Sequence, residues 1–172
     1  MMSSKKTRAK TTKRRKTSAP RGAFGLGLES LIGYNMRHAH GVQKQRFAAV
    51  FGPLGIRPVT LSLLGTIYDH PGIKQADLGK RLRIKRANMA PLLAELGVRG
   101  LIARRPSGSD RRAQLVTLTA AGKKFTARLL EIHERLEADL IAKLGARESE
   151  QLLQLLKKFR RLAPRSEPAD TD

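Results

Sequence analysis

The residue types best suited to contact nucleic acid are concentrated in two segments near the middle of the chain. Lys85, Arg86 and Asn88 lie within four positions, and these side chains pair with guanine edges, phosphates and adenine edges. A second segment holds four arginines within nine residues: Arg104, Arg105, Arg111 and Arg112. Arginine at a flexible tip suits a narrow, electronegative minor groove. Both segments are therefore predicted to bind duplex DNA.

A simpler interpretation exists for each segment. A run of charges on a helix is often only a solvated face, and for Lys85 and Arg86 alone that interpretation is equally good. Four arginines on one predicted hairpin of an already basic chain favour nucleic-acid contact instead. Asp110 is interpreted as a loop-organising residue, which could form an ion pair with Arg112 and orient its guanidinium.

The net charge indicates a polyanionic partner. The chain has 35 Lys and Arg against 14 Asp and Glu, a net charge of +21. Residues 1–21 carry nine of the basic residues and no acid, and removing them leaves +12 on the rest. Charge alone would also suit an acidic membrane surface or ribosomal RNA. The basic N-terminal arm could grip the phosphate backbone or capture an anionic ligand.

Several function classes are excluded by what the sequence lacks. There is no cysteine among the 172 residues, which removes disulfides, thiol catalysis and thiolate metal sites. We find no nucleophile–base set, no Walker loop and no metal-ligand spacing, so we predict no enzyme, no metal and no cofactor. No apolar run reaches the roughly 18–20 residues of a membrane span, and no export signal is apparent, so a cytoplasmic protein without membrane contact is expected.

The elements that must position these side chains follow from apolar spacing and from helix-ending residues. A long helix is expected from Leu28 to the Gly52-Pro53 pair, a second from Pro58 to about residue 69, and short ones over 74–82 and 85–99. Strands are expected over 101–105 and 114–118, and Thr119 is a plausible N-cap of the next long helix. A last helix is expected over 146–163. Pro91 would be tolerated in the first turn of its helix.

This order predicts an α+β fold that is mostly helical. The expected organisation is a disordered basic arm (1–22), a dimerisation helix (23–57), a DNA-binding lobe (58–122), C-terminal dimerisation helices (123–163) and a flexible tail (164–172). The outer helices carry long apolar stripes that a single lobe could not cover, which indicates a partner chain.

Between residues 77 and 122 the sequence closely resembles the MarR family of bacterial regulators. The family's hairpin motif is matched by Asp110, Arg112, Leu118, Thr119 and Gly122, and its entry to the hairpin by Gly100, Leu101, Ile102 and Arg104. In helix order the resemblance covers about residues 28–163. One departure is Lys74, where members usually place Ser or Thr to cap the third helix; a phosphate contact by Lys74 is a substitute interpretation.

The resemblance implies a winged helix-turn-helix repressor. Its first and last two helices would interleave in a homodimer and place two recognition helices about one DNA turn apart on a palindromic operator. The residues then expected to contact DNA are Lys74, Lys85, Arg86, Asn88, Met89, Arg104, Arg105, Ser109, Asp110, Arg111 and Arg112.

The segment Gly33-Tyr34-Asn35-Met36-Arg37 of the first helix, with Asn88-Met89-Ala90-Pro91-Leu92 later in the chain, resembles the branch of the family that controls degradation of phenolic acids. The resemblance implies an effector that is an aromatic acid or its CoA thioester, and that releases the DNA. Cations would hold the CoA phosphates and aromatic rings would line a slot for the acyl group; with His38, the expected residues are Tyr34, Arg37, Lys44, Arg46, Phe47 and Phe51. Alternatively, these cations are solvated or bind DNA phosphates.

One further alternative concerns the whole protein. A nucleoid-type protein would bind any DNA through charge, with a steep salt dependence and little sequence discrimination.

Overall fold

The computed structural model describes residues 27–108 and 113–162, which separate into two compact units, 27–55 and 56–162. The first unit consists of the 3-10 turn η1 (Leu28–Ser30), helix α1 (Ile32–Phe51) and the 3-10 turn η2 (Gly52–Leu54). The helix expected from Leu28 begins later because Leu31 is extended (φ −89°, ψ 127°). The Asn35 amide donates to the carbonyls of Glu29 and Leu31 at 2.6 and 2.9 Å and satisfies them at this break.

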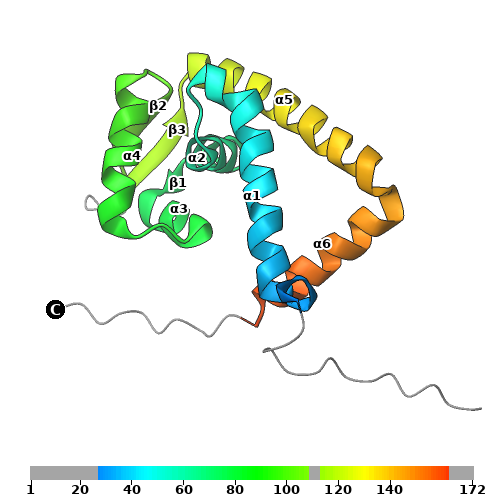
Figure 1. The fold of residues 1–172 in the computed structure, drawn as a ribbon. Coiled ribbons are helices and arrows are strands. Elements are labelled where there is room, and N and C mark those ends of the chain that lie inside the picture. The colour runs from blue at the N-terminus through cyan, green and yellow to red at the C-terminus, as the bar shows by residue number, and fades with distance from the viewer. Residues whose placement is uncertain (1–26, 109–112, 163–172) are drawn as a thin grey trace, which may run out of the picture. The chain divides into compact units, whose positions relative to one another are not determined.

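The second unit contains a short sheet and the remaining helices (Figure 1). Three antiparallel strands lie in the order β1-β3-β2. The expected strands are present, and β1, which is two residues long, was not predicted. The elements are α2 (Pro58–Asp69), β1 (Ile73–Lys74), α3 (Gln75–Leu82), α4 (Arg86–Val98), β2 (Ile102–Pro106), β3 (Gln114–Leu118), α5 (Ala120–Leu144) and α6 (Ala146–Arg160).

Helix α2 is at the centre of the second unit, because it contacts α5, β3 and α3 (Figure 1). Each of these elements contributes apolar side chains that are almost completely buried, so the sheet and the short helices share one core. Burial of this kind is the main favourable term in folding. The core includes Leu63, Leu64, Ile67, Leu78, Leu93, Leu96, Val116 and Leu129.

The predicted N-cap of α5 is confirmed and is part of a tight junction. The Thr119 hydroxyl accepts from the Gly122 N–H at 2.9 Å and donates to the Gly100 carbonyl at 2.7 Å. The Thr119 N–H donates to the Leu101 carbonyl at 3.1 Å. A Cβ atom on Gly122 would lie 1.9 Å from that same carbonyl oxygen. Glycine is therefore required here by the approach of another backbone.

Pro91 lies in the second turn of α4 and not in the first, because α4 begins at Arg86. Its missing N–H leaves the Ala87 carbonyl without the usual partner four residues on. Pro91 is exposed, so water can reach this side of the helix. The helix nevertheless continues to Val98.

The last helix carries an apolar face that nothing covers within the described residues. No residue of α6 is buried, and its large apolar side chains are 40–64% exposed over Leu152, Leu153, Leu155, Leu156 and Phe159. In the part of the chain that is described, no single helix is long and apolar enough to cross a membrane. The segments Ile32–Leu54 and Pro58–Asp69 reach that length and hydropathy only when they are added together, and they are bent by 76° relative to each other.

Candidate DNA-binding surface

A helix-turn-helix is formed by α3, a three-residue turn and α4. Arg83 ends α3 in the left-handed region (φ 54°), and the Ile84 N–H donates to the Gly79 carbonyl at 2.9 Å. This bond satisfies a carbonyl at the end of α3. A Cβ on Gly79 would lie 3.1 Å from the Ile84 carbonyl oxygen and 3.7 Å from the Met89 methyl. The absence of a side chain on Gly79 therefore lets the two helices approach closely.

The start of α4 exposes the side chains that were predicted to read bases. Lys85 is the N-cap in extended conformation, and Lys85, Arg86 and Asn88 are all exposed. The opposite stripe of α4 packs into the core through Leu93 and Leu96. Positively charged and amide side chains at the beginning of a second helix are the arrangement that enters the major groove.

Met89 is a correction to the predicted DNA contacts. Its side chain is 1% exposed. It lies on the apolar stripe of α4, four residues before Leu93 and seven before Leu96, and this spacing places it on the same face of the helix. Met89 therefore belongs to the core that holds α4 against α3.

The β2–β3 hairpin presents further arginines. Arg104 pairs with Val116 and Arg105 with Leu115, and both arginines are exposed on the edge strand β2. The Ser107 N–H donates to the Ala113 carbonyl at 2.8 Å and closes the described part of the hairpin. The predicted contacts Ser109, Asp110, Arg111 and Arg112 lie outside the described residues.

Strand β1 places Lys74 beside this hairpin. Lys74 pairs with Leu115 on one side of β3, and Arg105 pairs with Leu115 on the other. Residues directly opposite each other project from the same face of a sheet, and neighbouring strands are about 4.8 Å apart. Lys74 and Arg105 therefore share one face, roughly 10 Å apart. The neighbouring row contains Val116, which is fully buried, so the Lys74–Arg105 row faces away from the core.

Lys74 is also the N-cap of α3, and its side chain makes no capping hydrogen bond. The sequence departure at this position thus leaves the first turn of α3 without the side-chain oxygen that Ser or Thr would supply. The Lys74 side chain is exposed.

One residue that contacts α4 from outside it was not predicted. Arg57, which precedes α2, forms an ion pair with Glu95 on α4. Both side chains are about half exposed, so the pair contributes little to stability but restrains α4 from outside the core. Among the described residues, no group of three or more potential ligands could hold a metal ion.

Comparison with known proteins identifies the fold and the family. The MarR family model matches residues 56–113, from the start of α2 to the hairpin. The transcriptional regulator HosA of Escherichia coli is 33% identical over 98 residues, which cover 57% of this chain and 73% of HosA. The chain belongs to the MarR family. It is therefore a transcriptional regulator and not an enzyme.

Solved structures of other DNA-binding proteins agree with this architecture. The transcriptional repressor CouR, bound to a 23-mer DNA duplex, is 30% identical with a TM-score of 0.74; the match covers 77% of this chain and 94% of CouR. The regulator BpsR of Bordetella bronchiseptica, whose DNA binding is regulated by 6-hydroxynicotinic acid, is 21% identical with a TM-score of 0.72, over 78% of this chain and 96% of BpsR. The mostly helical α+β winged helix predicted from sequence is confirmed.

Proposed function

We propose that this MarR-family protein is a repressor that binds a palindromic operator as a homodimer and releases it when an aromatic acid or its CoA thioester binds. The observation that carries the proposal is the similarity to CouR, a repressor whose bound DNA duplex is part of its structure. The exposed Lys85, Arg86 and Asn88 at the start of α4 provide the base-reading side chains. Arg104 and Arg105, with Arg111 and Arg112 from the sequence between β2 and β3, provide the groove and backbone contacts.

The homodimer is supported by apolar surface in both units, each considered by itself. In the first unit, Leu28, Ile32 and Val42 are 57–70% exposed. In the second, Ile141 and Leu144 at the end of α5 are 43–44% exposed, in addition to the α6 face described above. Monomeric proteins rarely leave contiguous apolar surface of this kind open to water. A second copy of the same chain is the partner that we assign to it.

The candidate effector residues fall into two groups along α1. The rings of Tyr34 and His38 lie 4.3 Å apart, and Arg37 is exposed beside them. Near the other end, Phe47 and Phe51 stack at 4.4 Å and are both buried. From Tyr34 to Phe47 the helix rises roughly 20 Å, so one small aromatic acid cannot contact both groups. We assign the aromatic acid to the accessible Tyr34, Arg37 and His38, and the phosphates of a CoA thioester to Lys44 and Arg46.

The effector is tested by thermal unfolding with a panel of aromatic acids and their CoA thioesters. A ligand present at 100 times its dissociation constant stabilises the folded state by about 2.7 kcal/mol, which raises the melting temperature by several degrees. We expect such a rise with at least one member of the panel, and we expect Arg37→Ala to reduce it. Free CoA, which lacks the acyl ring, is the control ligand. A panel without any shift would overturn the effector assignment and leave the DNA-binding assignment standing.

Sequence-specific binding is tested with Asn88→Ala. A bidentate contact to one base is worth about 1–3 kcal/mol, so we expect a loss of about 10- to 100-fold on the operator and a much smaller loss on random duplex DNA. Fluorescence anisotropy with both duplexes measures the two losses. Equal losses would make Asn88 a backbone contact. A wild-type protein that binds both duplexes equally well would support the nucleoid-type alternative over a repressor.

A further inference from the structure

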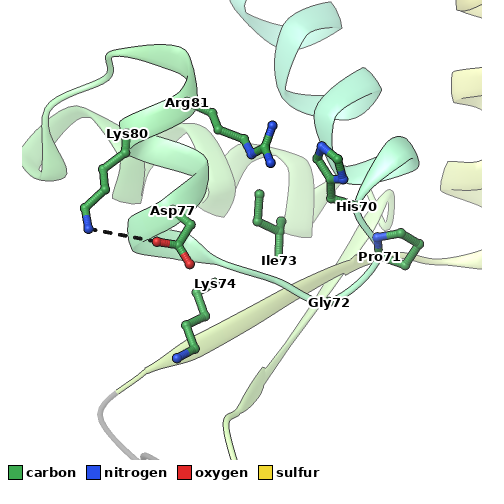
Figure 2. Close-up of a pocket in the computed structure, with 8 residues that line it drawn as sticks. All are labelled: His70, Pro71, Gly72, Ile73, Lys74, Asp77, Lys80 and Arg81. Atoms are coloured by element: carbon green, nitrogen blue, oxygen red, sulfur yellow. Dashed lines mark ion pairs between the residues drawn. The ribbon is translucent and has the colours of Figure 1, made fainter.

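A shallow basic hollow lies where the end of α2, β1 and α3 meet, and Lys74 is the one residue of its lining that was predicted from sequence to contact DNA. It has a volume of about 770 Å³. Figure 2 shows its lining side chains, with Arg81 extending toward the ring of His70 and Ile73 below them in this view. The residues that matter for its chemistry are His70, Lys74, Asp77, Lys80 and Arg81.

The charge of the hollow is positive. Lys74, Lys80 and Arg81 face a single carboxylate, Asp77, which lies 4.0 Å from the Lys80 ammonium with both side chains more than half exposed. An ion pair that is long and solvated in this way is weak. Within residues 27–108 and 113–162, Lys74 and Arg81 have no ion-pair partner. The positive charge of the hollow is therefore available to bind an anionic ligand.

The size and position of the hollow indicate which anion. The volume is within the range of small-molecule sites, so it can take a sugar–phosphate unit and is larger than a lone ion requires. Lys74 belongs both to the hollow and to the exposed row that it forms with Arg105 of the β2–β3 hairpin. The hollow is thus continuous with the face of the sheet that carries a predicted DNA contact.

We propose that this hollow binds a phosphodiester of the DNA backbone, and that Lys80 and Arg81 contact it together with Lys74. The proposal rests on the proposed function, because it requires a bound duplex. It extends that function by adding two phosphate contacts from α3 beside the one already expected of Lys74. Phosphate contacts position a protein on DNA and carry no sequence information.

The test measures how the affinity of the full chain for duplex DNA changes with salt. Each phosphate contact contributes about 0.9 to the slope of log K against log salt concentration. We expect Arg81→Ala and Lys80→Ala each to reduce the slope by roughly one unit and to weaken operator and random duplex equally. Arg128→Ala, an exposed arginine of α5 outside the hollow, is the matched control and should leave the slope unchanged. Arg81→Lys should restore most of it.

Two results would overturn the proposal. Slopes for Arg81→Ala and Lys80→Ala equal to that of the wild type would remove the hollow from the DNA interface while the repressor assignment stands. A melting-temperature rise with millimolar AMP that Arg81→Ala abolishes, combined with an unchanged slope, would assign the hollow to a soluble phosphate ester instead of DNA. A wild-type protein that binds no duplex would overturn the proposed function first.

Discussion

Replacing Gly122 by alanine is expected to destabilise the second unit by about 3 kcal/mol, the upper part of the range for overpacked sites. The new Cβ would lie 1.9 Å from the Leu101 carbonyl oxygen and 2.8 Å from its carbon. Neither is the end of a flexible side chain, so the backbone must move. The movement breaks the Thr119 cap and separates the hairpin from α5. Thermal unfolding should show a melting temperature lower by roughly 10 °C, and DNA affinity should fall with the folded fraction.

Gly97→Ala is the matched control for this prediction. Gly97 is a helical glycine of α4, and a Cβ there meets nothing within 4 Å. Alanine is preferred over glycine in a helix by about 1 kcal/mol, so this variant should be as stable as the wild type or more so. If Gly122→Ala and Gly97→Ala melt at the same temperature, the close approach of α5 to Leu101 is not what requires glycine.

The double variant Leu155→Glu/Phe159→Glu is expected to separate the proposed dimer. The two side chains are one helical turn apart and 64% and 48% exposed, so they share a face of α6. Two carboxylates on that face cannot be buried against a second copy without a large desolvation cost. Light scattering should give the mass of one chain in place of two. Operator affinity should fall about 10²- to 10⁴-fold, because the second half-site no longer acts at high effective concentration.

The control for the dimer prediction is Gln154→Glu, at an exposed position on the side of α6 opposite the apolar face. This variant should keep the mass of two chains. A double variant that also keeps that mass would move the interface away from α6, while a wild-type chain with the mass of one would overturn the dimer.

Local sequence features predicted the parts of the fold that depend on local interactions. The cap at Thr119 and the hairpin between β2 and β3 follow from residues close in sequence, and both are present. The strand β1 could not be predicted, because a two-residue strand has no periodicity and exists only through its pairing with β3. Met89 could have been assigned to the core, since its spacing from Leu93 and Leu96 is that of a buried stripe.

In the candidate sites, too, features set by residues close in sequence could be predicted, and features that join distant residues could not. Exposure of Lys85, Arg86 and Asn88 follows from their position at the start of a helix whose other stripe is apolar. The basic hollow could not be found in this way, because His70 ends α2 while Lys80 and Arg81 lie near the end of α3. The effector residues were selected by type along one helix, and the rise of that helix separates them into two groups.

Because Arg57 forms an ion pair with Glu95, the connection between the two units and a restraint on α4 lie within a few residues of each other. The boundary between the two units follows Gly55, which is in the left-handed region (φ 63°), and the second residue after it is bonded to the recognition helix. The covalent connection between the units and a restraint on α4 are thus almost the same piece of chain. An insertion between Gly55 and Arg57 would separate these roles even if every side chain were kept. The length of this connection is therefore as much a part of the recognition helix's support as the residues that it contacts.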